Sequence, residues 1–208
     1  MLIKICGITT PETAIACFEA GADMIGLVYY QPSPRHIAVA QMSEILDAVE
    51  PFKKNKHQTA LVVVDQLPDK DVVSRFDYIQ PYGIMRSDIP IKRIHVVKDY
   101  ETFTRLLEAP ITSGTIHLHA LEMSEGRLPG GNGAAWDWSL ARPFCERYPT
   151  LIAGGITPNN VAEVIRLANP AGIDVSSGVE SAPGVKDISK VKRLIENVHQ
   201  AIILPIIL

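Results

Sequence analysis

Short runs of apolar and β-branched residues recur along the chain, separated by longer segments in which apolar positions return every three or four residues. The short runs predict strands and the longer segments predict helices, because side chains alternate faces along a strand and share a face at helical spacing. Eight strands are expected, at residues 2–6, 22–30, 59–65, 77–80, 91–97, 115–122, 150–155 and 172–177. Seven helices are expected, at residues 10–21, 39–50, 69–76, 100–109, 136–148, 157–168 and 185–200. The segment that follows residue 80 is too short to predict a helix.

Most of the expected strands are apolar at consecutive positions, which is typical of a parallel sheet covered by helices on both faces. Eight such strands, with helices between them, fit a closed barrel better than an open sheet. The sequence therefore predicts an α/β protein, a single small (β/α)8 TIM barrel that spans residues 1–208 as one domain. Residues 201–208 are expected to form an apolar C-terminal extension, either packed, frayed or in contact with a partner.

The charge distribution argues against nucleic acid as a partner. The formal net charge is −3 and no basic run is longer than the pair Lys53 and Lys54, so few phosphates could be neutralised. The first residues lack the basic region and cleavage site of a signal peptide. The longest strongly apolar run, 201–208, is far below the roughly 20 residues that span a bilayer. A cytoplasmic protein without membrane contact is therefore expected.

The three cysteines, Cys6, Cys17 and Cys145, match neither a disulfide framework nor a zinc pattern, so free thiols are expected. Cys6 ends the first predicted strand, and the active sites of TIM barrels lie at the carboxyl ends of the strands. Strand alternation places Lys4 on the same inward face, and a nearby ammonium lowers the pKa of a thiol. We therefore expect Cys6 to be reactive, and Cys17 and Cys145 to be small buried side chains.

Glycine-rich loops follow the seventh and eighth predicted strands, at residues 153–160 and 174–184. Glycine lets backbone amides approach a ligand closely, and TIM barrels usually hold a phosphate in the loops after these two strands. Glycine is also common in ordinary turns, so neither loop alone would be informative. The occurrence of both loops predicts a ligand that carries a phosphate.

Five stretches of the chain together resemble one enzyme family. They are "KICGIT" at 4–9, "SPRHI" at 33–37, "GGNGAAWDWSL" at 130–140, "AGGITPNNVAEVI" at 153–165 and "GIDVSSGVESAPGVKD" at 172–187. In this order they resemble phosphoribosylanthranilate isomerase of tryptophan biosynthesis. The resemblance implies a TIM barrel that converts N-(5-phosphoribosyl)anthranilate to 1-(2-carboxyphenylamino)-1-deoxyribulose 5-phosphate by an Amadori rearrangement. It implies no metal and no organic cofactor, a phosphosugar as the binding partner, and a monomer or weak homodimer.

The resemblance also implies roles for individual residues. Cys6 matches the general base, which takes the proton from sugar C2′. Glu122 stands where the family has an aspartate as the general acid, which protonates the ribose ring oxygen. The other matched positions are expected to bind substrate: Arg35 beside the anthranilate, Asp174 near its amino group, Gln80 in the fourth strand, and Gly154, Gly155, Ser177 and Gly178 around the phosphate.

Two departures from the family pattern leave an alternative open. Glu122 is one methylene longer than the family's aspartate, and "QPYG" at 80–83 replaces "QLHG", so that Tyr82 stands where the family has a histidine. A degenerate paralogue that binds a phosphorylated sugar with little or no turnover would also fit. The sister Amadori isomerase of histidine biosynthesis fits less well, because it relies on two aspartates and needs two phosphate sites.

Two further motifs are interpreted as structural. His117 and His119 have a spacing that can bind zinc or copper, but if Glu122 points into the barrel both histidines face the helix layer. Trp136 and Trp138 are expected to pack beside Asp137, which fits a helix N-cap; a roof over an aromatic substrate is the alternative. Because His117 and His119 are expected to face the helix layer, no metal site is expected.

Overall fold

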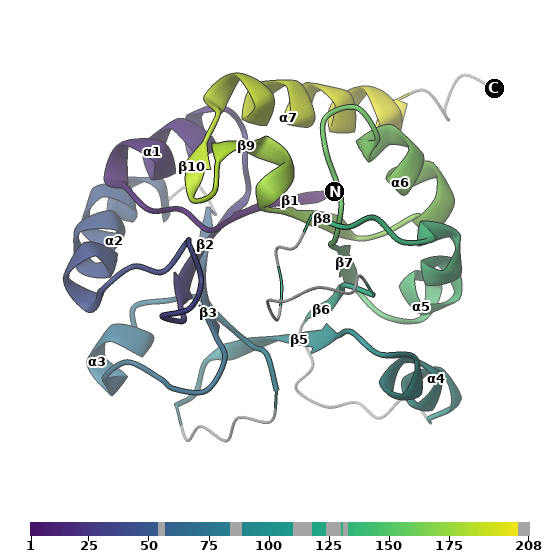
Figure 1. The fold of residues 1–208 in the computed structure, drawn as a ribbon, viewed down its shortest axis with the longest axis horizontal. Helices are drawn as coiled ribbons and strands as arrows, with labels where there is room; N and C mark the ends of the chain where they lie inside the picture. The colour runs from purple at the N-terminus through teal and green to yellow at the C-terminus, as the bar shows by residue number, and fades with distance from the viewer. Residues whose placement is uncertain (54–56, 84–88, 110–117, 124–129, 131–132, 204–208) are drawn as a thin grey trace.

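The structure, a computed structural model, describes residues 1–53, 57–83, 89–109, 118–123, 130 and 133–203. Parallel strands pair in chain order and close into a barrel, which is seen end on in Figure 1. The predicted (β/α)8 barrel is confirmed. Its strands are β1 (Leu2–Cys6), β2 (Met24–Tyr29), β3 (Gln58–Val63), β4 (Tyr78–Pro81), β5 (Lys92–Val97), β6 (Leu118–Leu121), β7 (Thr150–Ile152) and β8 (Gly172–Val175).

Helices surround the barrel in Figure 1, each between the strands that the sequence predicts for it. Thr10 caps the first helix as expected, since its side chain accepts a hydrogen bond from the amide of Thr13, and Pro11 opens the helix. Among the described ranges, no helix is long and apolar enough to cross a membrane. The helices are α1 (Pro11–Glu19), α2 (Val39–Lys53), α3 (Lys70–Val73), α4 (Tyr100–Glu108), α5 (Arg142–Arg147), α6 (Val161–Ala168) and α7 (Ile188–Ile203).

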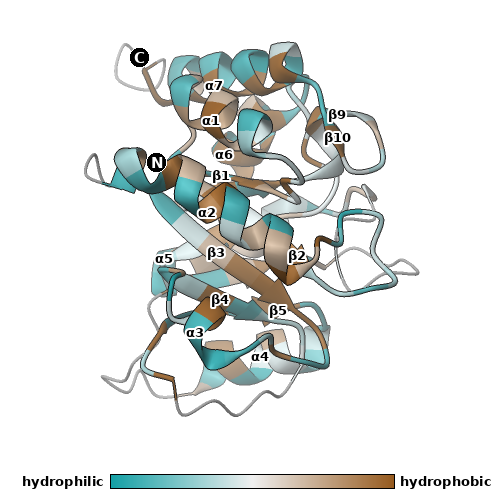
Figure 2. Cartoon of the chain, turned by 90° about the vertical axis from the view of Figure 1, so that its left-hand side faces the viewer, coloured by the Kyte–Doolittle hydropathy of each residue, from teal (hydrophilic) through white to brown (hydrophobic). Residues whose placement is uncertain are grey.

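Apolar side chains are divided between the barrel interior and the layer between strands and helices. Strand alternation produces this division, because successive residues point to opposite faces. Figure 2 shows it from the side, with apolar strand segments beneath helices that also carry polar residues. The interior cluster consists of Met24, Ala60, Tyr78, Ile94, Leu118, Ala120 and Leu151. Leu118 and Ala120 are on the face predicted for them, so Glu122, two residues further, also points inward.

Several predicted boundaries are wrong near the mouth of the barrel. β7 ends at Ile152 rather than at residue 155, because Gly154 and Gly155 have positive φ angles of 88° and 68°, which no strand accommodates. The single helix predicted at 136–148 is a 3₁₀ helix, η1 (Trp138–Ala141), followed by α5. Asp137 does cap η1, by accepting from the amide of Ser139.

A short hairpin after β8 was not predicted. β8 ends at Val175 and is followed by the 3₁₀ helix η2 (Ser177–Val179) and the antiparallel strands β9 (Glu180–Ala182) and β10 (Val185–Lys186). The hairpin includes residues 185 and 186, which helical periodicity had assigned to the last helix. That helix, α7, begins at Ile188 and continues to Ile203, so most of the proposed C-terminal extension lies outside the described residues.

His119 faces the helix layer, as predicted, and is buried among aromatic rings. Its ring centroid lies 5.3 Å from that of Phe144 and 4.9 Å from that of Tyr148, and His95 on the neighbouring strand β5 is 5.9 Å away. Burial, reinforced by His95, lowers the pKa of His119 from its ordinary 6.5 to about 4. His117, the other histidine of the pair considered for metal binding, lies outside the described residues.

Stability should therefore fall in mild acid. Below pH 6.5 the unfolded chain binds a proton at His119, whereas the folded chain binds one only near pH 4. The contribution of His119 to the free energy of unfolding is therefore fully present above pH 6.5 and is lost as the pH falls from 6.5 to about 4. The full effect is about 3 kcal/mol at 1.36 kcal/mol per pKa unit. Urea unfolding at pH 7 and pH 4.5 measures it. In His119→Phe, which keeps an aromatic ring, the loss should be smaller; an equal loss in both proteins would exclude His119 as its source.

Candidate active site

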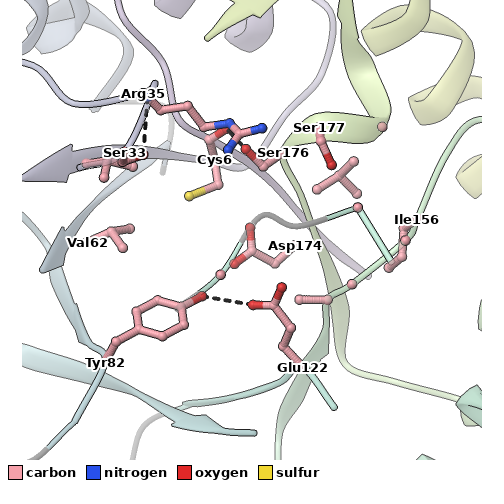
Figure 3. A pocket seen from close by; sticks show the side chains of 18 of the residues that line it. Cys6, Ser33, Arg35, Val62, Tyr82, Glu122, Ile156, Asp174, Ser176 and Ser177 are labelled. Atoms are coloured by element: carbon pink, nitrogen blue, oxygen red, sulfur yellow. Dashed lines mark hydrogen bonds between the residues drawn. The ribbon is translucent and has the colours of Figure 1, made fainter. Parts of the chain in front are cut away.

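A pocket that opens to solvent lies at the carboxyl ends of the strands, and its empty space, with open solvent included, is about 710 Å³. Gln80 is absent from the lining: it is fully buried within β4, below Tyr82. The other eight residues expected from the sequence line the pocket: Cys6, Arg35, Glu122, Gly154, Gly155, Asp174, Ser177 and Gly178 (Figure 3).

Cys6 is held at the end of β1 beside a buried ion pair. The Lys4 ammonium is completely buried and donates to the Asp174 carboxylate at 2.7 Å, across the pairing of β1 with β8. Burial lowers the pKa of Lys4, but Asp174 and Cys6 outweigh it, so the pKa is raised and the ammonium stays charged. Gly26 on β2 leaves room for the thiol, since a Cβ atom there would lie 2.8 Å from the Cys6 sulfur.

The expected low pKa of Cys6 is wrong for the unliganded site. Burial raises the pKa of the Cys6 thiol above its ordinary 9.0, and the charge of Lys4 lowers it only in part. Asp174 adds to the increase, because its negative charge disfavours a thiolate. Cys6 is therefore a thiol at neutral pH. Cys17 is buried as expected, whereas Cys145 is only partly buried; burial raises the pKa of each thiol to about 12.

The raised pKa of the Cys6 thiol can be tested by alkylation. The rate at which iodoacetamide modifies Cys6 should be low at pH 7 and rise about tenfold per pH unit up to at least pH 9, since only the thiolate reacts. Mass spectrometry of the peptide that contains Cys6 gives the rate, and Cys6→Ala provides the blank. A rate that already levels off near pH 7 would mean that Lys4 outweighs burial.

Glu122 lies across the pocket from Cys6, with Asp174 between them (Figure 3). Its backbone amide donates to the carbonyl of Val97 at 3.0 Å, which continues the pairing of β6 with β5 past the last strand residue. Its side chain is only 3% exposed and accepts a hydrogen bond from the Tyr82 hydroxyl at 3.0 Å. An acid–base pair on opposite sides of one ligand is thus geometrically available.

The side chain of Arg35 is fixed by Glu180, a residue that the sequence pattern did not indicate. Its Nε and Nη2 each donate to the carboxylate of Glu180, both at 2.8 Å, in a buried bidentate pair. Lys186 donates to the same carboxylate at 2.7 Å. Burial raises the pKa of Glu180, but Arg35 and Lys186 outweigh it and the pKa is lowered. The unexpected hairpin β9–β10 thus carries the anchor of Arg35, 145 residues away in the chain.

The glycines of the two loops permit a close approach of backbone to backbone. A Cβ atom on Gly178 would lie 1.8 Å from the carbonyl oxygen of Ile156, and one on Gly155 would lie 2.5 Å from the backbone of Ala135. The amides of 154, 155, 177 and 178 donate to no turn or loop carbonyl of the described residues. All four residues line the pocket, and Figure 3 shows Ser177 on the side opposite Val62. Free backbone amides in such loops can receive an anion.

The two tryptophans support one of these loops. The indole nitrogen of Trp136 donates to the carbonyl of Ala153 at 2.8 Å, and that of Trp138 to the carbonyl of Gly154 at 3.3 Å. They therefore pack as expected and fix the loop after β7. Among the described residues, no group of three or more His, Cys, Asp or Glu is arranged to hold a metal ion.

A family model and curated relatives match nearly the whole chain. The model described as N-(5'phosphoribosyl)anthranilate (PRA) isomerase matches residues 3–197. The protein named N-(5'-phosphoribosyl)anthranilate isomerase from Desulfatibacillum aliphaticivorans is 37% identical over 212 residues, which cover 95% of this chain and 93% of the relative. The protein of that name from Trichlorobacter lovleyi is also 37% identical, over 96% of this chain and 98% of the relative.

Solved structures agree with this match. Phosphoribosyl anthranilate isomerase from Thermotoga maritima superposes with a TM-score of 0.78 at 30% identity, covering 96% of this chain and 99% of its own. A structure of phosphoribosyl anthranilate isomerase in complex with reduced 1-(o-carboxyphenylamino)-1-deoxyribulose 5-phosphate gives a TM-score of 0.76 at 30% identity and the same coverage. The chain therefore belongs to the N-(5'-phosphoribosyl)anthranilate isomerase family.

Proposed function

We propose that this chain performs the isomerase reaction of its family with Cys6 as the general base and Glu122 as the general acid. The family and its curated relatives support the activity, a step of tryptophan biosynthesis. The observation that supports the two roles is the position of the Cys6 thiol and the Glu122 carboxyl group on opposite sides of one pocket (Figure 3).

The reaction needs one proton donor and one proton acceptor. Glu122 gives a proton to the furanose ring oxygen as the bond from C1′ to that oxygen breaks, which leaves an iminium ion. Cys6 removes the proton from C2′ as the thiolate, which is the minor form in the unliganded site, and the electron pair of that C–H bond forms the enolamine. C1′ then takes up a proton while the C2′ hydroxyl loses one, which gives the ketone. Protons lost and gained by the substrate balance, as an isomerisation requires.

The pocket offers separate surroundings for the two ends of such a substrate. The apolar side chains of Val28, Val62 and Val64, which line the same pocket as Arg35, suit an aromatic carboxylate, and Arg35 supplies the charge. The amides of the two glycine-rich loops suit the phosphate. Asp174 retains one acceptor for an amino group, because only its Oδ2 is bonded, while its buried Oδ1 has no partner among the described residues.

Gln80 is proposed to act indirectly. Its buried side-chain oxygen has no hydrogen-bond partner among the described residues, and Gln80 lies on β4, two residues before Tyr82. We propose that it supports the floor of the pocket rather than touching the substrate. For the assembly we propose a monomer or weak homodimer; one solved relative from Thermotoga maritima is described as dimeric.

Turnover of freshly generated N-(5-phosphoribosyl)anthranilate tests the proposal. Loss of substrate fluorescence, with detection of the ketone product by mass spectrometry, should follow enzyme concentration linearly. Heat-denatured protein is the control for spontaneous decay of the substrate. Tight binding of the reduced product analogue without turnover would instead support the degenerate paralogue.

A further inference from the structure

We propose that Tyr82 is a positioning residue for Glu122: its hydroxyl fixes the carboxyl group and stabilises the carboxylate that remains once the proton has been transferred. This inference rests on the proposed role of Glu122 as the acid. It concerns the residue that stands in place of a histidine in the resembling family, and it assigns that residue a chemical purpose in this chain.

The geometry places donor and acceptor from two strands in direct contact. The Tyr82 hydroxyl lies 3.0 Å from Glu122 Oε2, and Figure 3 shows the ring directed from the end of β4 toward the end of β6. The base of Tyr82 is also fixed, because its amide donates to the carbonyl of Val63 at 2.8 Å. The ring lies beneath the ammonium of Lys98, 5.9 Å from the ring centroid.

Gly130 shows that the space around this contact is closely fitted. A Cβ atom at position 130 would lie 2.2 Å from the Tyr82 hydroxyl oxygen and 2.9 Å from Glu122 Oε2. Any other residue would therefore push the pair apart. Glycine at position 130, in the connection after β6, thus has a steric reason that is separate from the flexibility of a loop.

Tyr82 can serve only as a donor to this carboxylate. Burial, followed by the negative charges of Glu122, Asp174 and Cys6, raises the pKa of Tyr82 well above 10, so the hydroxyl keeps its proton. A hydrogen bond to a charged acceptor is stronger than one to a neutral acceptor. The contact therefore strengthens as Glu122 gives up its proton, which is the change that favours the transition state of ring opening.

The test is the pH profile of Tyr82→Phe, which keeps the ring and the contact with Lys98. We expect kcat to fall by about 10- to 100-fold, as for loss of a hydrogen bond to a charged group, with KM nearly unchanged. The limb of the profile on which activity falls as Glu122 ionises should move to higher pH, because the carboxylate is now harder to form. Replacement by 3-fluorotyrosine, a stronger donor, should move this limb to lower pH.

Tyr78→Phe is the matched control. It removes a hydroxyl from β4, four residues before Tyr82, at a position inside the barrel and outside the pocket lining, and should leave the profile unchanged. A drop in kcat for Tyr82→Phe with no displacement of the limb would assign Tyr82 a merely structural role and overturn the inference. The inference would also be overturned if the limb moved in the same direction for Tyr82→Phe and for 3-fluorotyrosine at position 82. Turnover by the unmodified chain tests the proposed function separately.

Discussion

Cys6→Ala should fold normally and lose at least about 100-fold in turnover, because a positioned general base typically contributes 10² to 10⁴. The fold should be unaffected, since Cys6 is at the end of β1 and its side chain lines the pocket rather than the core. Steady-state kinetics with freshly generated substrate measure the loss. Binding of the reduced product analogue should change little, because the thiol contributes to a proton transfer and not to the phosphate or anthranilate contacts.

Cys17→Ala is the control for this experiment. Cys17 is a buried thiol on the same part of the chain, in α1, and its loss should affect stability but not turnover. Cys6→Ser is informative as well, since a hydroxyl is a much weaker acid than a thiol and should not restore the rate. Turnover retained by Cys6→Ala would remove Cys6 from the mechanism, and the base would have to be sought at Asp174.

Glu122→Gln should abolish turnover while product binding is barely weakened. The amide keeps nearly the shape of the carboxyl group and can still accept a hydrogen bond from Tyr82, but it has no proton to give. Kinetics and calorimetric titration with the reduced product analogue separate these two effects. If turnover is unchanged in Glu122→Gln, the acid lies elsewhere, and Asp174 is the next candidate.

Glu122→Asp is expected to lower the rate, although it restores the side chain common in the family. The carboxyl group would retreat by about one methylene, and a displacement on the order of 1 Å can cost about 100-fold. The 3.0 Å contact with Tyr82 would be lost at the same time. A rate higher than that of the unmodified chain would instead show that Glu122 reaches too far for its substrate.

The barrel and most of the pocket could be read from the chain, because they depend on local periodicity. Alternation along β1 correctly placed Lys4 and Cys6 inside, and alternation along β6 placed His119 outside and Glu122 inside. The predicted ends of β7 and β8 were wrong because β7 ends at glycines with positive φ angles and β8 ends before the 3₁₀ helix η2, and neither feature leaves a periodic signal. A carboxylate followed by a lysine six residues later, Glu180 and Lys186, was the only sequence hint of the Arg35 anchor.

The sequence by itself determined the fold, the inward residues and the family, since these follow from patterns that neighbouring positions share. Only the tertiary structure decided the electrostatics of the site, which depend on distances between residues far apart in the chain. Asp174 meets Lys4 across 170 positions, and burial of this region reverses the expected direction of the Cys6 pKa. The contact of Tyr82 with Glu122 spans 40 positions and exists because barrel closure brings the ends of β4 and β6 to one mouth.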